Sequence, residues 1–141
     1  MTSIASIYFA GSISGGREDA AQYHKIIRLL AEYGRVLTEH VGDPELSASG
    51  ESRRTSAEVY QQDMDWLAQA DVLVAEVSIP SHGVGYEIAR AEGTGTPVLC
   101  LYRPGEGARL SAMLGGNPAV QCESYATMDD VEALLKRFFS P

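Results

Sequence analysis

Two carboxylates, Asp63 and Glu87, stand in sequence contexts that favour chemistry over ordinary surface charge. At about 100° per residue, Asp63 falls on the apolar side of its predicted helix, within about 60° of Val59, Leu67, Tyr60, Trp66 and Ala70. A carboxylate there must find partners or take a raised pKa, which is what a general acid needs near neutrality. The alternative is a structural Asp bonded to backbone or Arg. Asp65 falls on the far side of the helix, where we expect a solvated charge.

Glu87 follows a glycine-containing loop, Pro80-Ser-His-Gly-Val-Gly-Tyr-Glu87, that leaves the carboxyl end of a predicted central strand. In the first turn of its helix this Glu could simply compensate the helix dipole. Alternatively, it points into the same crevice as Asp63, which lies on the preceding helix. Two carboxylates of unlike environment facing one pocket make the acid-plus-nucleophile arrangement of retaining glycoside cleavage.

A second glycine-rich loop connects the first predicted strand to the first predicted helix. It holds Gly11, Gly15 and Gly16 together with two hydroxyls, Ser12 and Ser14. Exposed N–H groups at a helix N-terminus suit an anion, and glycine lets the backbone approach it. The spacing is neither GxGxxG nor GxxxxGK[ST], so it supports neither a dinucleotide fold nor a P-loop NTPase. A tight turn without a ligand is the alternative.

The remaining reactive side chains give weaker signals. The histidines His24, His40 and His82 have no metal-ligand spacing, so we expect neither a metal nor a redox cofactor. His40 ends a predicted strand and could reach the crevice, although an exposed loop histidine is the alternative. No GxSxG elbow supports a serine nucleophile.

Composition limits the partners that such a site could serve. The 141 residues carry 11 Lys+Arg against 19 Asp+Glu, a formal net charge of −8. This acidity argues against nucleic-acid polymers and anionic membranes, but it permits one small phosphorylated ligand. Cys100 and Cys122 form no CxxC pair, and no signal peptide or long apolar run is evident. We expect a soluble protein that is located in the cytoplasm, with a nuclear location as the alternative.

The elements that must position these residues alternate between strands and helices. Strands are predicted at Ile4–Ala10, Arg35–Thr38, Val72–Val77, Pro97–Tyr102 and Ala119–Cys122. Helices are predicted from Arg17 to about Tyr33, after Thr55 to Ala70, at Val84–Gly93, and at Met128–Phe139, with a possible turn at Leu110–Leu114. This pattern predicts one α/β domain over residues 1–141, a Rossmann-like (flavodoxin-like) parallel five-stranded sheet with helices on both faces. Ligands bind at the carboxyl ends of such strands.

Four segments together resemble a known enzyme family. They are YFAGSISGGRED (Tyr8–Asp19), VLTEHV (Val36–Val41), YQQDMDWLAQADVLVAEVSIPSHGVGYEIARA (Tyr60–Ala91) and LCLYRPGEGARLSAML (Leu99–Leu114). In order and spacing they are similar to the 2′-deoxynucleoside 5′-monophosphate N-hydrolases of the nucleoside 2-deoxyribosyltransferase superfamily. The likeness spans nearly the whole chain.

The resemblance implies a role for each matching residue. Glu87 matches the nucleophile that carries the deoxyribosyl group, Asp63 the acid/base carboxylate, and Tyr8 the tyrosine that orients the nucleophile. The resemblance also implies a homodimer in which Ser111 completes the neighbouring site. We assign substrate binding to Gly11, Ser12, Ile13, Ser14, Gly15, Gly16, Arg17, His40, Ser81, Gly83, Gly85, Ser111 and Met113.

The chain departs from the family pattern at Ser14. At this position the family motif, GSIRGGR, has Arg instead. The 5′-phosphate must then be held by hydroxyls, backbone N–H groups and Arg17. We predict hydrolysis of 2′-deoxyribonucleoside 5′-monophosphates to free base and 2-deoxyribose 5-phosphate. The alternatives are base exchange by a deoxyribosyltransferase, a non-catalytic nucleotide-binding module and, more weakly, a cytokinin-type phosphoribohydrolase, whose PGGxGTxxE signature is absent.

Overall fold

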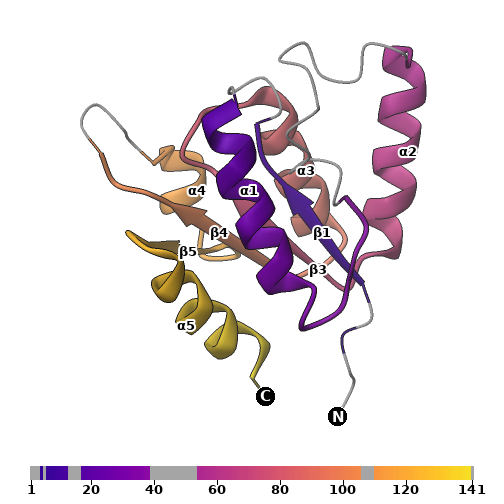
Figure 1. The fold of residues 1–141 in the computed structure, drawn as a ribbon. Coiled ribbons are helices and arrows are strands. Elements are labelled where there is room, and N and C mark those ends of the chain that lie inside the picture. Colours follow the sequence, from indigo (N-terminus) through magenta and orange to yellow (C-terminus); the bar gives the residue numbers. More distant parts are fainter. Residues whose placement is uncertain (1–3, 5, 13–16, 39–53, 106–109, 141) are drawn as a thin grey trace.

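One parallel sheet organises the computed structural model, which describes residues 4, 6–12, 17–38, 54–105 and 110–140. Within this part of the chain the sheet has five strands in the order β2-β1-β3-β4-β5 (Figure 1). They are β1 (Ser6–Ala10), β2 (Arg35–Val36), β3 (Val72–Glu76), β4 (Val98–Tyr102) and β5 (Gln121–Ser124). The predicted α/β fold is confirmed. Because the winding direction reverses between β1 and β3, the carboxyl ends of these two strands are the expected ligand edge.

Helices cover both faces of this sheet. They are α1 (Arg17–Leu30), α2 (Ser56–Gln69), α3 (His82–Gly93), the short α4 (Ala112–Gly115) and α5 (Met128–Phe139). The predicted capping box at the start of α2 is present, with Thr55 and Glu58 bonding each other's backbone N–H. Thr127 caps α5 in the same way with Asp130. No helix in the described ranges is long and apolar enough to cross a membrane.

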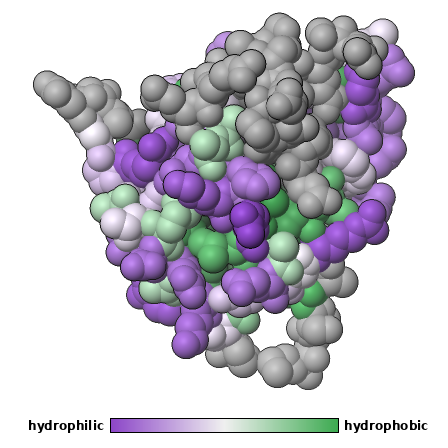
Figure 2. Space-filling model, viewed as in Figure 1, coloured by the Kyte–Doolittle hydropathy of each residue, from purple (hydrophilic) through white to green (hydrophobic). Residues whose placement is uncertain are grey.

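Alternating strand residues divide the core into two layers. Ile7, Phe9 and Val74 pack with α1 and α5, whereas Tyr8, Ala10 and Leu73 pack with α2 and α3. In the view of Figure 2, hydrophilic residues cover the outer side of α2, and apolar residues appear between α1 and α2. Because side chains alternate between the two faces of a strand, Tyr8 lies on the face that α2 and α3 cover. These two helices carry Asp63 and Glu87.

Several element boundaries differ from the sequence prediction by one to three residues, and side-chain contacts explain two of these differences. The last strand begins at Gln121 rather than Ala119, because Asn117 forms a turn in which its side chain accepts the N–H of Ala119 and its carbonyl that of Val120. Helix α3 begins at His82 rather than Val84, because the Ser81 hydroxyl accepts the N–H of Val84 and caps the helix.

Candidate active site

A tyrosine in the sheet contacts the carboxylate on α3. Tyr8, in the middle of β1, is 1% exposed, and its hydroxyl donates a hydrogen bond to Oε2 of Glu87. The two residues are 79 positions apart in sequence, so only the parallel pairing of the sheet brings them together. The contact fixes the Glu87 carboxylate from the floor of the site.

Asp63 and Glu87 line one cavity of about 260 Å³. Gly83 and three side chains from α2 and α3 complete its walls: Tyr60, Met64 and Tyr86. The Tyr60 and Tyr86 rings meet edge to face with centroids 6.2 Å apart, and each residue is 50% exposed. Both aromatic residues therefore leave half of their surface open to a ligand.

The environment of Glu87 raises its pKa to about 7. Burial is the main cause, because it disfavours the charged form, and the nearby Asp63 carboxylate adds to the rise. The hydrogen bond from Tyr8 opposes both effects, since it stabilises the carboxylate. Burial and the two carboxylates raise the pKa of Tyr8 well above its usual value, so this hydroxyl remains a donor.

The position of Glu87 in its helix removes one alternative for its role. Since α3 begins at His82, Glu87 is in the second turn, and the first turn holds no acidic residue. The expectation that Glu87 lies in the first turn is therefore wrong. Helix-dipole compensation is weak at this distance, because it falls off within the first turn.

The glycine-rich loop between β1 and α1 is described only at its two ends. Gly11 packs against Tyr23 of α1, and a Cβ at Gly11 would lie 3.0 to 3.2 Å from the Tyr23 ring. The Ser12 N–H donates to the Tyr23 hydroxyl at 3.2 Å. The predicted binding residues Ile13, Ser14, Gly15, Gly16 and His40, and the side chain of Arg17, lie outside the described part of the chain.

The other predicted binding residues fall into two places. Gly83 lines the cavity with Asp63 and Glu87. The rest line a separate apolar groove of about 640 Å³ between α3 and the segment around α4: Ser81, Gly85, Ser111 and Met113. Met113 is 81% exposed, and Ser111 caps α4 by accepting the Met113 N–H at 3.2 Å.

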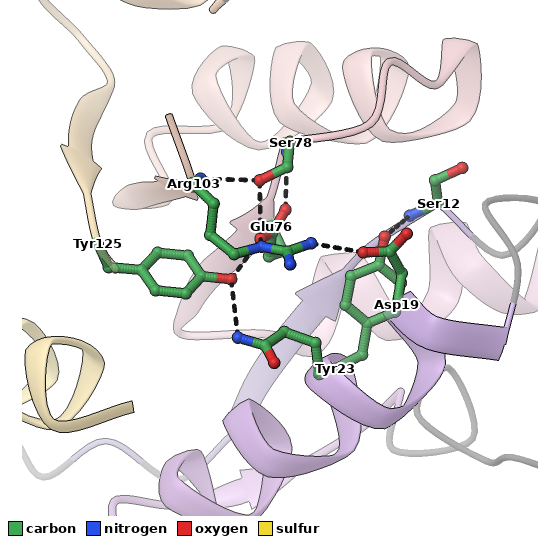
Figure 3. A network of polar contacts seen from close by, with 8 residues as sticks. Ser12, Asp19, Tyr23, Glu76, Ser78, Arg103 and Tyr125 are labelled. Carbon is green, nitrogen blue, oxygen red and sulfur yellow. Dashed lines mark hydrogen bonds and ion pairs between the residues drawn. The ribbon is translucent and has the colours of Figure 1, made fainter. Parts of the chain in front are cut away.

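Sequence reasoning missed a buried polar cluster at the carboxyl ends of the strands (Figure 3). Its centre is Glu76, the last residue of β3, which is 1% exposed and paired with Arg103. An acidic residue closing an otherwise apolar strand was the available signal. In the part of the chain that the structure describes, no three His, Cys, Asp or Glu side chains form a group that could hold a metal ion.

Comparison with known proteins identifies close relatives of this chain. The family model for nucleoside 2-deoxyribosyltransferase matches residues 7–118. The chain is 51% identical over 138 residues to 5-hydroxymethyl-dUMP N-hydrolase of Rattus norvegicus, a match that covers 95% of this chain and 84% of the rat protein. It is 48% identical over 139 residues to the protein of the same name in Homo sapiens, covering 95% of this chain and 79% of that one.

A more distant solved structure shares the fold. The CMP N-glycosidase BcmB of Clostridium botulinum superimposes with a TM-score of 0.65 at 16% identity, over 94% of this chain and 98% of that one. At this identity the likeness concerns the arrangement of the sheet and helices alone.

Proposed function

The chain belongs to the nucleoside 2-deoxyribosyltransferase family, and from this premise we propose that it hydrolyses the N-glycosidic bond of 2′-deoxyribonucleoside 5′-monophosphates. The products are the free base and 2-deoxyribose 5-phosphate. The observation that carries the proposal is the cavity in which Asp63 and Glu87 meet, with Tyr8 bonded to Glu87. The names of the rat and human relatives favour 5-hydroxymethyl-dUMP as one substrate. We assign all 141 residues to one domain of this family.

The first step is attack by a carboxylate on the sugar. Ionised Glu87 attacks the anomeric carbon, the N-glycosidic bond breaks, and Asp63 assists departure of the base, which takes its proton from water. Tyr8 holds Glu87 in position through the hydrogen bond from its hydroxyl and stays protonated because its own pKa is raised. With a pKa of about 7, a large fraction of Glu87 is ionised at neutral pH.

The second step releases the sugar. Water attacks the same anomeric carbon, the glycosyl ester to Glu87 breaks, and Asp63 accepts the proton of that water. Two displacements at one carbon retain its configuration. The lack of a 2′-hydroxyl makes the oxocarbenium-like transition state easier to reach, so deoxyribonucleotides react faster than ribonucleotides.

A substrate panel tests this assignment. We expect 5-hydroxymethyl-dUMP and other deoxynucleoside monophosphates to release base, while the matched ribonucleotides and unphosphorylated deoxynucleosides react at least about tenfold more slowly. Chromatography of released base gives the measurement, with a second free base added in one arm. Formation of a new nucleoside in that arm would identify a transferase, and no base release from any substrate would contradict the proposal.

We also propose that two copies of the chain complete each site. The groove that holds Ser111 and Met113 is largely apolar and lies apart from the cavity with Asp63 and Glu87. The 81% exposure of Met113 suits a surface that a second copy covers. We place this dimer in the cytoplasm, with a nuclear location as the alternative.

Mixed dimers test whether Ser111 acts across the interface. Mixing the inactive variants Glu87→Gln and Ser111→Ala should recover roughly a quarter of wild-type activity after subunit exchange, because half of the dimers then have one intact site. If Ser111 serves its own chain, every site carries one substitution and no activity returns. Sedimentation of the mixture checks that dimers form.

A further inference from the structure

The buried polar cluster lies on the opposite side of the sheet from the catalytic carboxylates. We define the Glu76 cluster as Glu76, Ser78, Arg103, Asp19 and Tyr125 (Figure 3). Glu76 shares the face of Val72 and Val74, which pack with α1 and α5, whereas Tyr8 faces α2 and α3. The cluster is therefore separate from the cavity that holds Asp63 and Glu87.

Hydrogen bonds from two segments and an ion pair from a third stabilise the Glu76 carboxylate. Ser78 donates its N–H to Oε1 at 2.7 Å and its hydroxyl to Oε2 at 2.9 Å. The Tyr125 hydroxyl also donates to Oε2, and Nε of Arg103 lies 3.4 Å from the same atom. A carboxylate that is 1% exposed needs such partners to remain ionised. These contacts fix the turn by which the chain leaves β3.

Arg103 extends the cluster to α1. Its guanidinium donates to Asp19, in the first turn of α1, at 2.5 Å, and its backbone N–H donates to the Ser78 hydroxyl at 2.8 Å. Helix α1 in turn holds the end of β1, because Tyr23 accepts the Ser12 N–H. Arg103 therefore connects the beginning of α1 to the turn after β3.

The turn after β3 leads directly into the helix that carries Glu87. Ser78 precedes Ser81 by three residues, and Ser81 caps α3. Because Arg103 faces two carboxylates, Glu76 and Asp19, its positive charge is neutralised within the cluster. This charge balance favours a positioning role over direct binding of an anion.

We propose that Glu76 and Arg103 are positioning residues that hold the Ser12 end of β1 and the N-terminal end of α3 at a fixed separation. This inference rests on the proposed function and on the prediction that Ser12 and Ser81, which lie at the ends of these two segments, bind the nucleotide. Glu87 is also held from β1 by Tyr8, which the cluster does not contact. Loss of the cluster should therefore weaken substrate binding while the chemistry of bound substrate changes little.

Steady-state kinetics of Arg103→Met and Glu76→Gln test this role. We expect KM for the deoxynucleotide to rise about tenfold or more, kcat to change less than about threefold, and the acid limb of the pH profile to stay in place. Arg103→Lys, which keeps the charge without the planar fork, should restore part of the loss. A KM within twofold of wild type in both variants would overturn the proposal.

Two control variants separate positioning from stability. Arg137→Met removes an exposed arginine of α5, and Thr127→Ala removes the N-cap of that helix. Thr127→Ala should lower the melting temperature, yet neither control should change KM. If Thr127→Ala raises KM as much as Arg103→Met does, the cluster acts only through stability and the proposal fails.

Amide NMR spectra of the substrate-free protein provide a readout that needs no turnover. In Arg103→Met we expect shifted or broadened resonances for both Ser12 and Val84, and none in Arg137→Met. Changes confined to Ser78 and its neighbours would overturn the positioning role even in an active enzyme. If both resonances respond but the wild type releases no base, the proposed function fails and the coupling of the two segments stands.

Discussion

Replacing Glu87 by Gln abolishes base release, lowering kcat for a deoxynucleotide by at least about 10³-fold. The amide keeps the size of the side chain and can still accept the Tyr8 hydrogen bond, but it cannot attack the anomeric carbon. The measurement is chromatography of the released base in single-turnover and steady-state experiments. The matched control is Glu132→Gln, an exposed position on α5, which should keep wild-type turnover. Near-normal turnover by the Glu87→Gln variant would contradict the assignment.

The same variant should be more stable than the wild type at high pH. The pKa of Glu87 rises from 4.5 to about 7 on folding, so the folded state binds the proton more tightly than the unfolded state. Wild-type stability therefore falls as pH rises from 4.5 through 7, by at most roughly 3 kcal/mol. Chemical denaturation of Glu87→Gln and wild type should give different unfolding free energies at pH 8 and converging values below about pH 4.5. Lost activity in a more stable protein is not a folding defect.

Much of the fold could be predicted because its signals are local. The Thr55 and Thr127 caps and the apolar strand runs place most of the elements correctly. The later start of β5 and the earlier start of α3 depend on side-chain contacts that residue type alone does not reveal. Asn117 delays β5, and the Ser81 cap starts α3 early, which also places Glu87 in the second turn.

The candidate site was predictable where a residue's own helix or loop made it unusual. Asp63 interrupts an apolar stripe, and Glu87 follows a glycine loop; the structure brings both to one cavity. In the Glu76 cluster only Glu76 itself, an acidic residue at the end of an apolar strand, was unusual; its partners could not be found, since 84 residues separate Asp19 from Arg103 and 49 separate Glu76 from Tyr125. Only the strand order β1-β3-β4-β5 brings the ends of these segments together.

The acidic composition takes on a more specific meaning once these contacts are known. Of the 19 acidic residues, Glu87 and Asp63 sit in the cavity, and Glu76 and Asp19 neutralise Arg103. The guanidinium of Arg103, beside the start of α1, is therefore already paired with carboxylates of the protein itself. Under the proposed function, we therefore expect the phosphate to be bound by backbone N–H groups, hydroxyls and Arg17, as predicted from the Ser at position 14.

The pH profile of kcat/KM should have an acid limb near pH 7. Glu87 must be ionised to attack, and its pKa of about 7 means that activity falls tenfold for each pH unit below that value, or about 100-fold by pH 5. The nucleotide phosphate also titrates, with a second pKa near 6 in phosphorylated side chains, so the wild-type limb alone does not assign the group.

Two substitutions that move this limb in opposite directions make the assignment. Tyr8→Phe removes the hydrogen bond that lowers the Glu87 pKa, so the limb should move to higher pH. Asp63→Asn removes the negative charge that raises the Glu87 pKa, so the limb of the residual activity should move to lower pH. A limb that stays in place in both variants would assign the ionisation to the substrate phosphate. Opposite shifts identify the titrating group as the Glu87 carboxyl, which accepts the Tyr8 hydrogen bond and interacts electrostatically with Asp63, because neither substitution alters the phosphate.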